Sequence, residues 1–164
     1  MKDKLCYKKE TFVLILIAVV LLSGIGFLAD GYAKTNLIET FKELDQKDLA
    51  LQGSKISTVN IKTKAGEIYC GKQLEKALAY FEELQAKGLC LKLDSAKYGN
   101  IKVLKHKGNS AVLLVESQYS GKYVTVDNKN EALRKMALNM VCQVELARDG
   151  SDWKIADLVV LKEE

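Results

Sequence analysis

The feature that most constrains this chain is an apolar run of 18 residues, Phe12 to Ala29, without a single charged side chain. At about 1.5 Å per residue a helix of this length spans roughly 27 Å, close to a bilayer's hydrocarbon core of about 30 Å. A helix that is apolar on every face rarely lies at the end of a soluble domain. The run therefore predicts a transmembrane signal anchor at residues 12–29.

The charges around this run predict its orientation. Four lysines lie in the first nine residues, and positively charged flanks tend to stay on the cytoplasmic side of a membrane. We therefore expect residues 1–11 to form a cytoplasmic tail. Residues 34–164 should then form an extracytoplasmic domain of a bacterial cell envelope.

The alternative is that the apolar run is a signal peptide that is cleaved after Ala33. Gly31 and Ala33 place small residues at positions −3 and −1 of such a cleavage site. The domain would then be secreted instead of anchored. The run is longer than the usual apolar region of a signal peptide, about 7–15 residues, which favours the anchor.

The first half of the domain is predicted to contain two helices and a short strand. Apolar residues recur with helical spacing at 36–51 and again at 72–87, where Gly88 is the expected C-cap. Residues 59–63 alternate between apolar and polar side chains, which predicts a strand that ends in a turn at Ala65-Gly66.

After residue 88 the hydrophobic period changes from 3.6 to 2, and five strands are predicted, at 89–93, 98–107, 110–126, 133–148 and 153–161. The turns expected between them are Gly99-Asn100, Gly108-Asn109, Asp127-Asn128 and Asp149-Gly150. Alternate residues from Leu138 to Leu146 are apolar, so one face of that strand should pack and the other should be wetter. These elements predict an α+β fold, with helices on one side of a curved, mainly antiparallel, cone-like sheet.

The element order, the long strands and the closing segment 152–158 (DWKIADL) resemble the nuclear-transport-factor-2-like (cystatin-like) superfamily over residues 35–162. Many members end in a similar strand, in which Trp precedes a basic residue and Ile, although Trp153 also fits an ordinary core aromatic in a hairpin. The resemblance implies a domain with a conical pocket, which some members use as isomerases or dehydratases. Other members are non-catalytic domains behind one membrane helix, such as VirB-type assembly factors of type IV secretion systems and division-ring tethers of plastids. The layout of this chain resembles the second group.

Two motifs suggest chemistry that their details do not support. Residues 66–72 read G-x-x-x-x-G-K, as in a phosphate-binding loop, but Gln73 stands where a Ser or Thr is needed to ligate Mg²⁺. His106 is the only histidine, which excludes a His-rich zinc site and argues against a Ser/His/Asp triad. The net charge of +4 is spread along the chain, so nucleic acid is not expected as a partner. We predict no catalytic residue, metal or cofactor.

The cysteines contain no C-x-x-C pair, which argues against a zinc ribbon or a thioredoxin-type site. Cys90 and Cys142 are the one pair predicted as a candidate disulfide, and the alternative is that both are small buried hydrophobes. Cys70 precedes a predicted helix, whose N-terminus would lower the pKa of its thiol.

Tyr119, Lys122 and Tyr123 form the candidate interaction surface, because tyrosines exposed on a sheet are favoured at recognition sites. The alternative is that these tyrosines are ordinary sheet aromatics. An isomerase-like pocket would need a desolvated carboxylate and a hydrogen-bond donor. Residues considered for that pocket are Asp157, Glu116, Tyr80, Tyr98 and Tyr119.

The sequence thus favours a membrane-anchored, non-enzymatic interaction or assembly module. It would bind a protein partner, a peptide or further copies of itself through the open sheet or its edge. The alternative is a secreted or anchored small-ligand-binding protein or pocket enzyme of the same fold. A cone filled by Leu, Val and Met would favour the first reading, and a cavity of about 300 Å³ or more with converging polar groups the second.

Overall fold

The computed structural model describes residues 33–54, 58–127 and 132–164. The chain divides into two units, Met1–Asn36 and Leu37–Glu164, and the sites considered below belong to the second. The predicted tail at 1–11 and the predicted anchor at 12–29 lie outside the described residues. Among the residues described, no helix has the length and apolar character needed to cross a bilayer.

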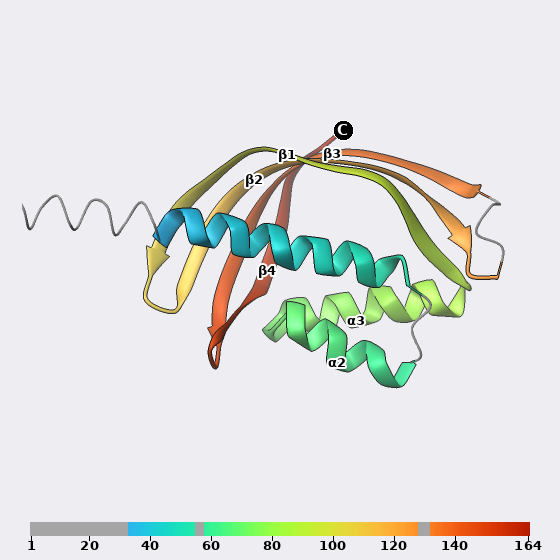
Figure 1. The fold of residues 1–164 in the computed structure, drawn as a ribbon, viewed down its shortest axis with the longest axis horizontal. Helices are drawn as coiled ribbons and strands as arrows, with labels where there is room; N and C mark the ends of the chain where they lie inside the picture. Colours follow the sequence, from blue (N-terminus) through green and yellow to red (C-terminus); the bar gives the residue numbers. More distant parts are fainter. Residues whose placement is uncertain (1–32, 55–57, 128–131) are drawn as a thin grey trace, which may run out of the picture. The chain divides into compact units, whose positions relative to one another are not determined.

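The described residues form three helices followed by a four-stranded antiparallel sheet (Figure 1). The helices span residues 33–52, α2 (Thr58–Ile68) and α3 (Gly71–Ala86). The strands are β1 (Leu89–Lys107), β2 (Ser110–Thr125), β3 (Ala132–Asp149) and β4 (Asp152–Glu163). Their order in the sheet is the order in the chain, β1-β2-β3-β4. The sheet curves and the helices lie on one of its faces, so the predicted α+β arrangement is confirmed.

Two of the helices form where hydrophobic spacing predicts them. The helix at residues 33–52 buries Leu37, Phe41 and Leu44, which recur at intervals of three and four and so share one face. Helix α3 buries Ala77, Phe81 and Leu84 for the same reason. It is followed by Gly88, whose φ of +62° is a conformation that only glycine adopts readily.

The predicted strand at 59–63 and the predicted turn at Ala65-Gly66 are wrong. Both lie within helix α2. Ile61, Ala65 and Ile68 are spaced four and three residues apart, and all three are buried in the core as one helical face. The β-branched residues favour a strand locally, but burial of this face against the rest of the domain outweighs that preference.

The strands predicted at 89–93 and 98–107 are one continuous strand, β1. Its pairing with β2 shifts register between Leu93 and Ser95, between Tyr98 and Ile101, and between Val103 and Lys105. Gly99 and Asn100 therefore mark an irregularity within β1 and not a turn. Irregularities of this kind bend a strand and increase its twist, which lets a 19-residue strand follow a curved sheet.

The remaining turns agree better with the prediction. β1 and β2 are joined at Gly108-Asn109, as expected, and β3 and β4 at Gly150-Ser151, one residue beyond the predicted turn. Gly108 and Gly150 both have positive φ, which explains why glycine stands in each hairpin. The predicted turn at Asp127-Asn128 is only partly within the described residues.

The core lies between the helices and the inward face of the sheet. Alternate residues of β2 and β3 point into it, and among the most deeply buried are Leu113, Val115, Val144 and Leu146. The alternation from Leu138 to Leu146 thus identifies the packing face of β3 correctly. At Gly121 of β2 a Cβ atom would lie 2.6 Å from the carbonyl oxygen of Lys92, so the close approach of β1 there requires glycine.

Candidate functional site

Two aspartates of the 33–52 helix face the sheet from within the helix's apolar stripe. Asp45 and Asp48 are three residues apart, so their side chains lie on neighbouring positions of one face. They are half-buried, beside the buried side chains of Leu44 and Leu51. This helix therefore brings two carboxyl groups, as well as apolar side chains, to the inner side of the sheet.

Asp45 is held by two tyrosines of neighbouring strands. The hydroxyl of Tyr98 on β1 donates a hydrogen bond to Asp45 Oδ2 at 2.6 Å, and the hydroxyl of Tyr119 on β2 donates to the same oxygen at 3.0 Å. Burial raises the pKa of Asp45, and these two hydrogen bonds act in the opposite direction. The neutral acid is therefore favoured more than it would be in water.

Asp48 begins a chain of hydrogen bonds that crosses the inner side of the domain. Gln52 Nε2 donates to Asp48 Oδ2 at 2.7 Å, and the Tyr69 hydroxyl bonds the same carboxyl group. Tyr80 donates to Gln52 Oε1 at 3.2 Å, and the Tyr80 and Tyr123 hydroxyls lie 2.8 Å apart. Burial raises the pKa of Asp48 to about 6, with the Tyr69 and Gln52 bonds opposing the shift.

Apart from Tyr98, these polar groups line a cavity of about 220 Å³ between the helices and the sheet. Its apolar wall includes Leu91, Met136, Leu138, Met140 and Ile155. The cavity is smaller than the 300 Å³ expected of a ligand-binding cone, but polar groups converge on it as that reading requires. The cavity therefore fully matches neither the filled cone expected of an interaction module nor the large polar cavity expected of a ligand-binding protein.

The predicted interaction surface is not a single exposed patch. Tyr119 is only 8% exposed, and it points with Tyr123 toward the cavity. Lys122 lies between them on β2, and successive residues of a strand point to opposite faces, so its side chain lies on the other side of the sheet. The prediction is wrong about the exposure of Tyr119, while a contact between this segment and a partner stays a prediction.

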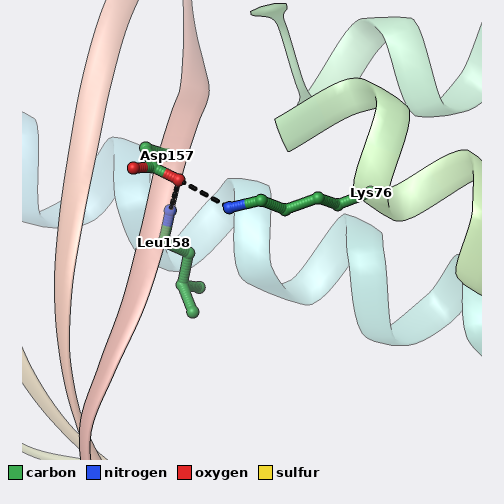
Figure 2. A network of polar contacts seen from close by, with 3 residues as sticks. All are labelled: Lys76, Asp157 and Leu158. Carbon is green, nitrogen blue, oxygen red and sulfur yellow. Dashed lines mark hydrogen bonds and ion pairs between the residues drawn. The ribbon is translucent and has the colours of Figure 1, made fainter. Parts of the chain in front are cut away.

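The structure brings together only some of the predicted pocket residues. Tyr80, Tyr98 and Tyr119 all belong to the hydrogen-bond network described above. Glu116 is exposed. Asp157 pairs with Lys76 Nζ at 2.9 Å and accepts a bond from the Leu158 N–H at 3.0 Å (Figure 2). These bonds lower the pKa of Asp157, so it is an ordinary ionised surface carboxylate.

The carboxylates that do reach the cavity, Asp45 and Asp48, were missed by the sequence analysis. Position in the sequence could have identified Asp48. It lies four residues after Leu44 and three before Leu51, so it occupies a place on the apolar stripe of the helix. A charged residue at such a place is either exposed at the edge of the buried face or held by polar partners. The sequence does not identify the tyrosines that would hold it.

Cys70, Cys90 and Cys142, the cysteines within the described residues, are free thiols. Cys90 and Cys142 are both buried and are not bonded to each other, which agrees with the alternative that they are small core residues. Burial raises the pKa of the Cys70 thiol, so the predicted lowering by helix α3 is wrong.

The G-x-x-x-x-G-K stretch runs from helix α2 into helix α3 instead of following a strand. Within the described ranges, no group of three or more His, Cys, Asp or Glu is placed to hold a metal ion.

The C-terminal end of β4 is a second notable surface. Val159, Val160 and Leu161 are consecutive and are 46%, 44% and 56% exposed. β4 is an edge strand, and in the described part of the chain its outer edge pairs with another segment only at Ile155, which contacts Tyr69 and Cys70. Exposed apolar side chains on the strand and the main-chain groups of an open edge thus lie at the same place.

Comparison with known proteins supports the fold and no more. No family model matches the sequence, and no curated protein matches it. The crystal structure of the intermembrane space region of the chloroplast protein ARC6 is similar, with a TM-score of 0.56 and 16% identity over 75% of this chain and 95% of that one. A de novo designed β-sheet protein aligns with 15% identity over 79% of this chain and 90% of that one, but at a TM-score of 0.36. The resemblance to the nuclear-transport-factor-2-like superfamily stays a prediction.

Proposed function

We propose that residues 34–164 form a non-enzymatic interaction or assembly module, held at a bacterial membrane by residues 12–29, which binds a protein partner through the free end of β4. The observation that carries this proposal is the run of three exposed apolar residues, Val159 to Leu161, on an edge strand. The partner would contribute an extended segment that pairs with β4 and covers these side chains.

The physical argument is that such an edge is costly to leave open. Edge strands present unpaired N–H and C=O groups, and proteins usually protect them with charges, bulges or a covering segment. Single exposed apolar residues are common, but several gathered at one place mark an interaction site more often, and these three are consecutive on an edge strand. A strand added at this edge would gain main-chain hydrogen bonds, and its side chains would cover alternate residues of β4.

Two further observations support the proposal. The uncharged run at 12–29 would place the domain next to a membrane, where an assembly factor has to be. The similar fold of the ARC6 region comes from a part of that protein that lies between two membranes. The fold is therefore used in at least one protein domain that faces a compartment bounded by membranes, although fold alone does not determine function.

The proposal is tested by site-specific photocrosslinking of the full chain in its native membrane. A photoreactive residue replaces Leu161 in one variant and Leu104 in the other. Leu104 lies on β1, the opposite edge strand, and is 54% exposed against 56% for Leu161, so the two positions are matched in exposure. We expect one reproducible protein adduct from position 161 and none of that mass from position 104.

A second variant decides whether the adduct reports binding. Val159→Asp places a charge two residues from the crosslinking position and should abolish the adduct, whereas Leu133→Asp, at a residue 55% exposed on β3, should leave it unchanged. Equal adducts from positions 161 and 104, or an adduct that survives Val159→Asp, would contradict binding at this edge.

A further inference from the structure

The cavity is lined by two carboxyl groups. Asp45 and Asp48 both line it, and among the described residues that line it there is no lysine, arginine or histidine. Carboxyl groups that are shielded from water are normally paired with a cation or become protonated. The partners found for these carboxyl groups in the described part of the domain are neutral, so a positive charge inside the cavity would be stabilised.

The two tyrosine partners of Asp45 leave one of its oxygens open to such a charge. Tyr98 and Tyr119 both donate to one oxygen of Asp45, Oδ2, so neither of them occupies Oδ1. An ionised carboxylate has about four acceptor positions over its two oxygens. A cation that carries N–H donors could therefore bind without displacing either tyrosine.

The walls of the cavity suit an organic cation. Four tyrosines, Tyr69, Tyr80, Tyr119 and Tyr123, line it, as do Met136 and Met140. The faces of aromatic rings attract ammonium groups, and apolar walls favour an alkyl chain. We infer that this cavity is a binding site for a small organic ammonium ion, which pairs with Asp45 and Asp48 and places its alkyl part against Met136 and Met140.

The size of the cavity restricts the ligand further. Pockets for drug-sized molecules are usually about 300–1,000 Å³, whereas this cavity is about 220 Å³. A short alkylammonium ion fits this description better than a nucleotide, a peptide or a bulky amine. This inference is independent of the proposed protein partner at β4, because the two sites share no residue.

The experiment uses the full chain in a non-ionic detergent, with methionine labelled with ¹³C in its methyl group. The chain has three methionines. Met136 and Met140 line the cavity, and Met1 serves as the internal reference. Butylammonium chloride and the neutral analogue 1-butanol are titrated separately at pH 7. We expect butylammonium to shift the Met136 and Met140 signals to saturation, and 1-butanol to bind at least about tenfold more weakly.

Two variants test the role of the carboxyl group. Asp48→Asn keeps the size of the side chain and should weaken butylammonium binding by about tenfold or more. Asp157→Asn removes an exposed carboxylate that is paired with Lys76 outside the cavity, and should leave binding unchanged. Equal effects of the two substitutions would mean that butylammonium responds to overall charge and would contradict the inference.

The unmodified protein gives a test that does not depend on the folding of a variant. Butylammonium favours ionised Asp48, so binding at pH 6 should release protons, which calorimetry in buffers of different ionisation enthalpy would detect. Equal affinity for 1-butanol and butylammonium would show an apolar cavity with no preference for a cation. The absence of saturable shifts from either compound would show that the two carboxyl groups serve only the fold.

Discussion

The cavity and the C-terminal end of β4 distribute polarity in opposite ways. In the cavity, two carboxyl groups are shielded from water among tyrosines and apolar side chains, and the described lining residues include no cationic side chain. At the end of β4, three apolar residues face the solvent on an edge strand. Both arrangements cost folding free energy relative to the usual partition of polar and apolar groups. Departures from that partition concentrate at functional sites, so the two regions are where a ligand and a partner should be sought.

The largest predicted difference between the two regions is in the free energy of unfolding lost when a leucine is shortened to alanine. Leu113→Ala removes a side chain with no exposed surface from the core beneath the cavity, and should lower the free energy of unfolding by about 3–5 kcal/mol. Leu161→Ala on β4 should change it by less than about 0.5 kcal/mol. Urea unfolding of the full chain in non-ionic detergent, followed by circular dichroism, measures both. A large loss from Leu161→Ala would show that the end of β4 belongs to the core.

The second prediction concerns the pH dependence of stability. The pKa of Asp48 is about 6 in the folded protein against 3.8 in its ordinary state, so between these pH values the folded protein binds more protons than the unfolded chain. Stability should therefore fall as pH rises from 4 to 7, by about 3 kcal/mol from this group. Asp45 acts in the same direction, because its pKa is also raised.

Two variants distinguish the source of this pH dependence. Asp48→Asn should remove most of the decrease between pH 4 and 7. Asp157→Asn should leave that decrease in place, because the pKa of Asp157 is lowered and its contribution is lost only at more acidic pH. An unchanged slope in Asp48→Asn would mean that Asp48 is not desolvated in the folded protein.

Two tyrosines of β2 provide a smaller comparison within the network. Tyr119→Phe removes a hydroxyl that donates to a shielded carboxylate and should cost about 1.5–3 kcal/mol. Tyr123→Phe removes a bond between two hydroxyls, and Tyr80 keeps Gln52 as a partner, so it should cost about 0.5–1.5 kcal/mol. Thermal or urea unfolding at pH 7 resolves the order. A reversed order would place the stronger interaction at Tyr123.

The smallest effect is expected at the surface ion pair of Lys76 and Asp157. Both side chains are exposed, and isolated surface pairs contribute little. Asp157→Asn should leave the urea midpoint at pH 7 unchanged within the error of the measurement. A clear loss would mean that this pair, which joins helix α3 to β4, holds the helix in place (Figure 2).

Most of the fold could be predicted because its local signals agree with its packing. The spacing of Leu37, Phe41 and Leu44 specifies a helix, and the structure buries those residues. The alternation in β2 and β3 and the turn glycines Gly108 and Gly150 specify a meander of long strands. In each case the residues that form the element also determine which face of it is buried.

The failures arise where distant contacts decide the outcome. Helix α2 forms because Ile61 and Ile68 pack into the core as a helical face, although five residues at its start alternate like a strand. The continuity of β1 through Gly99 depends on its pairing with β2, which a dipeptide does not specify. The site was missed for the same reason, because Asp45 meets Tyr98 and Tyr119 only through the register of two strands with a helix.

The identity of sheet order and chain order has a consequence for folding kinetics. Each strand pairs with the one that precedes it, so the sheet can grow one hairpin at a time from local contacts, which generally form fast. The contact between Asp45 and Tyr119 joins residues 74 positions apart, and closing such a loop is entropically more costly. We therefore expect the first helix to close over a sheet that has already formed. The same contact should be among the first to open when the domain unfolds.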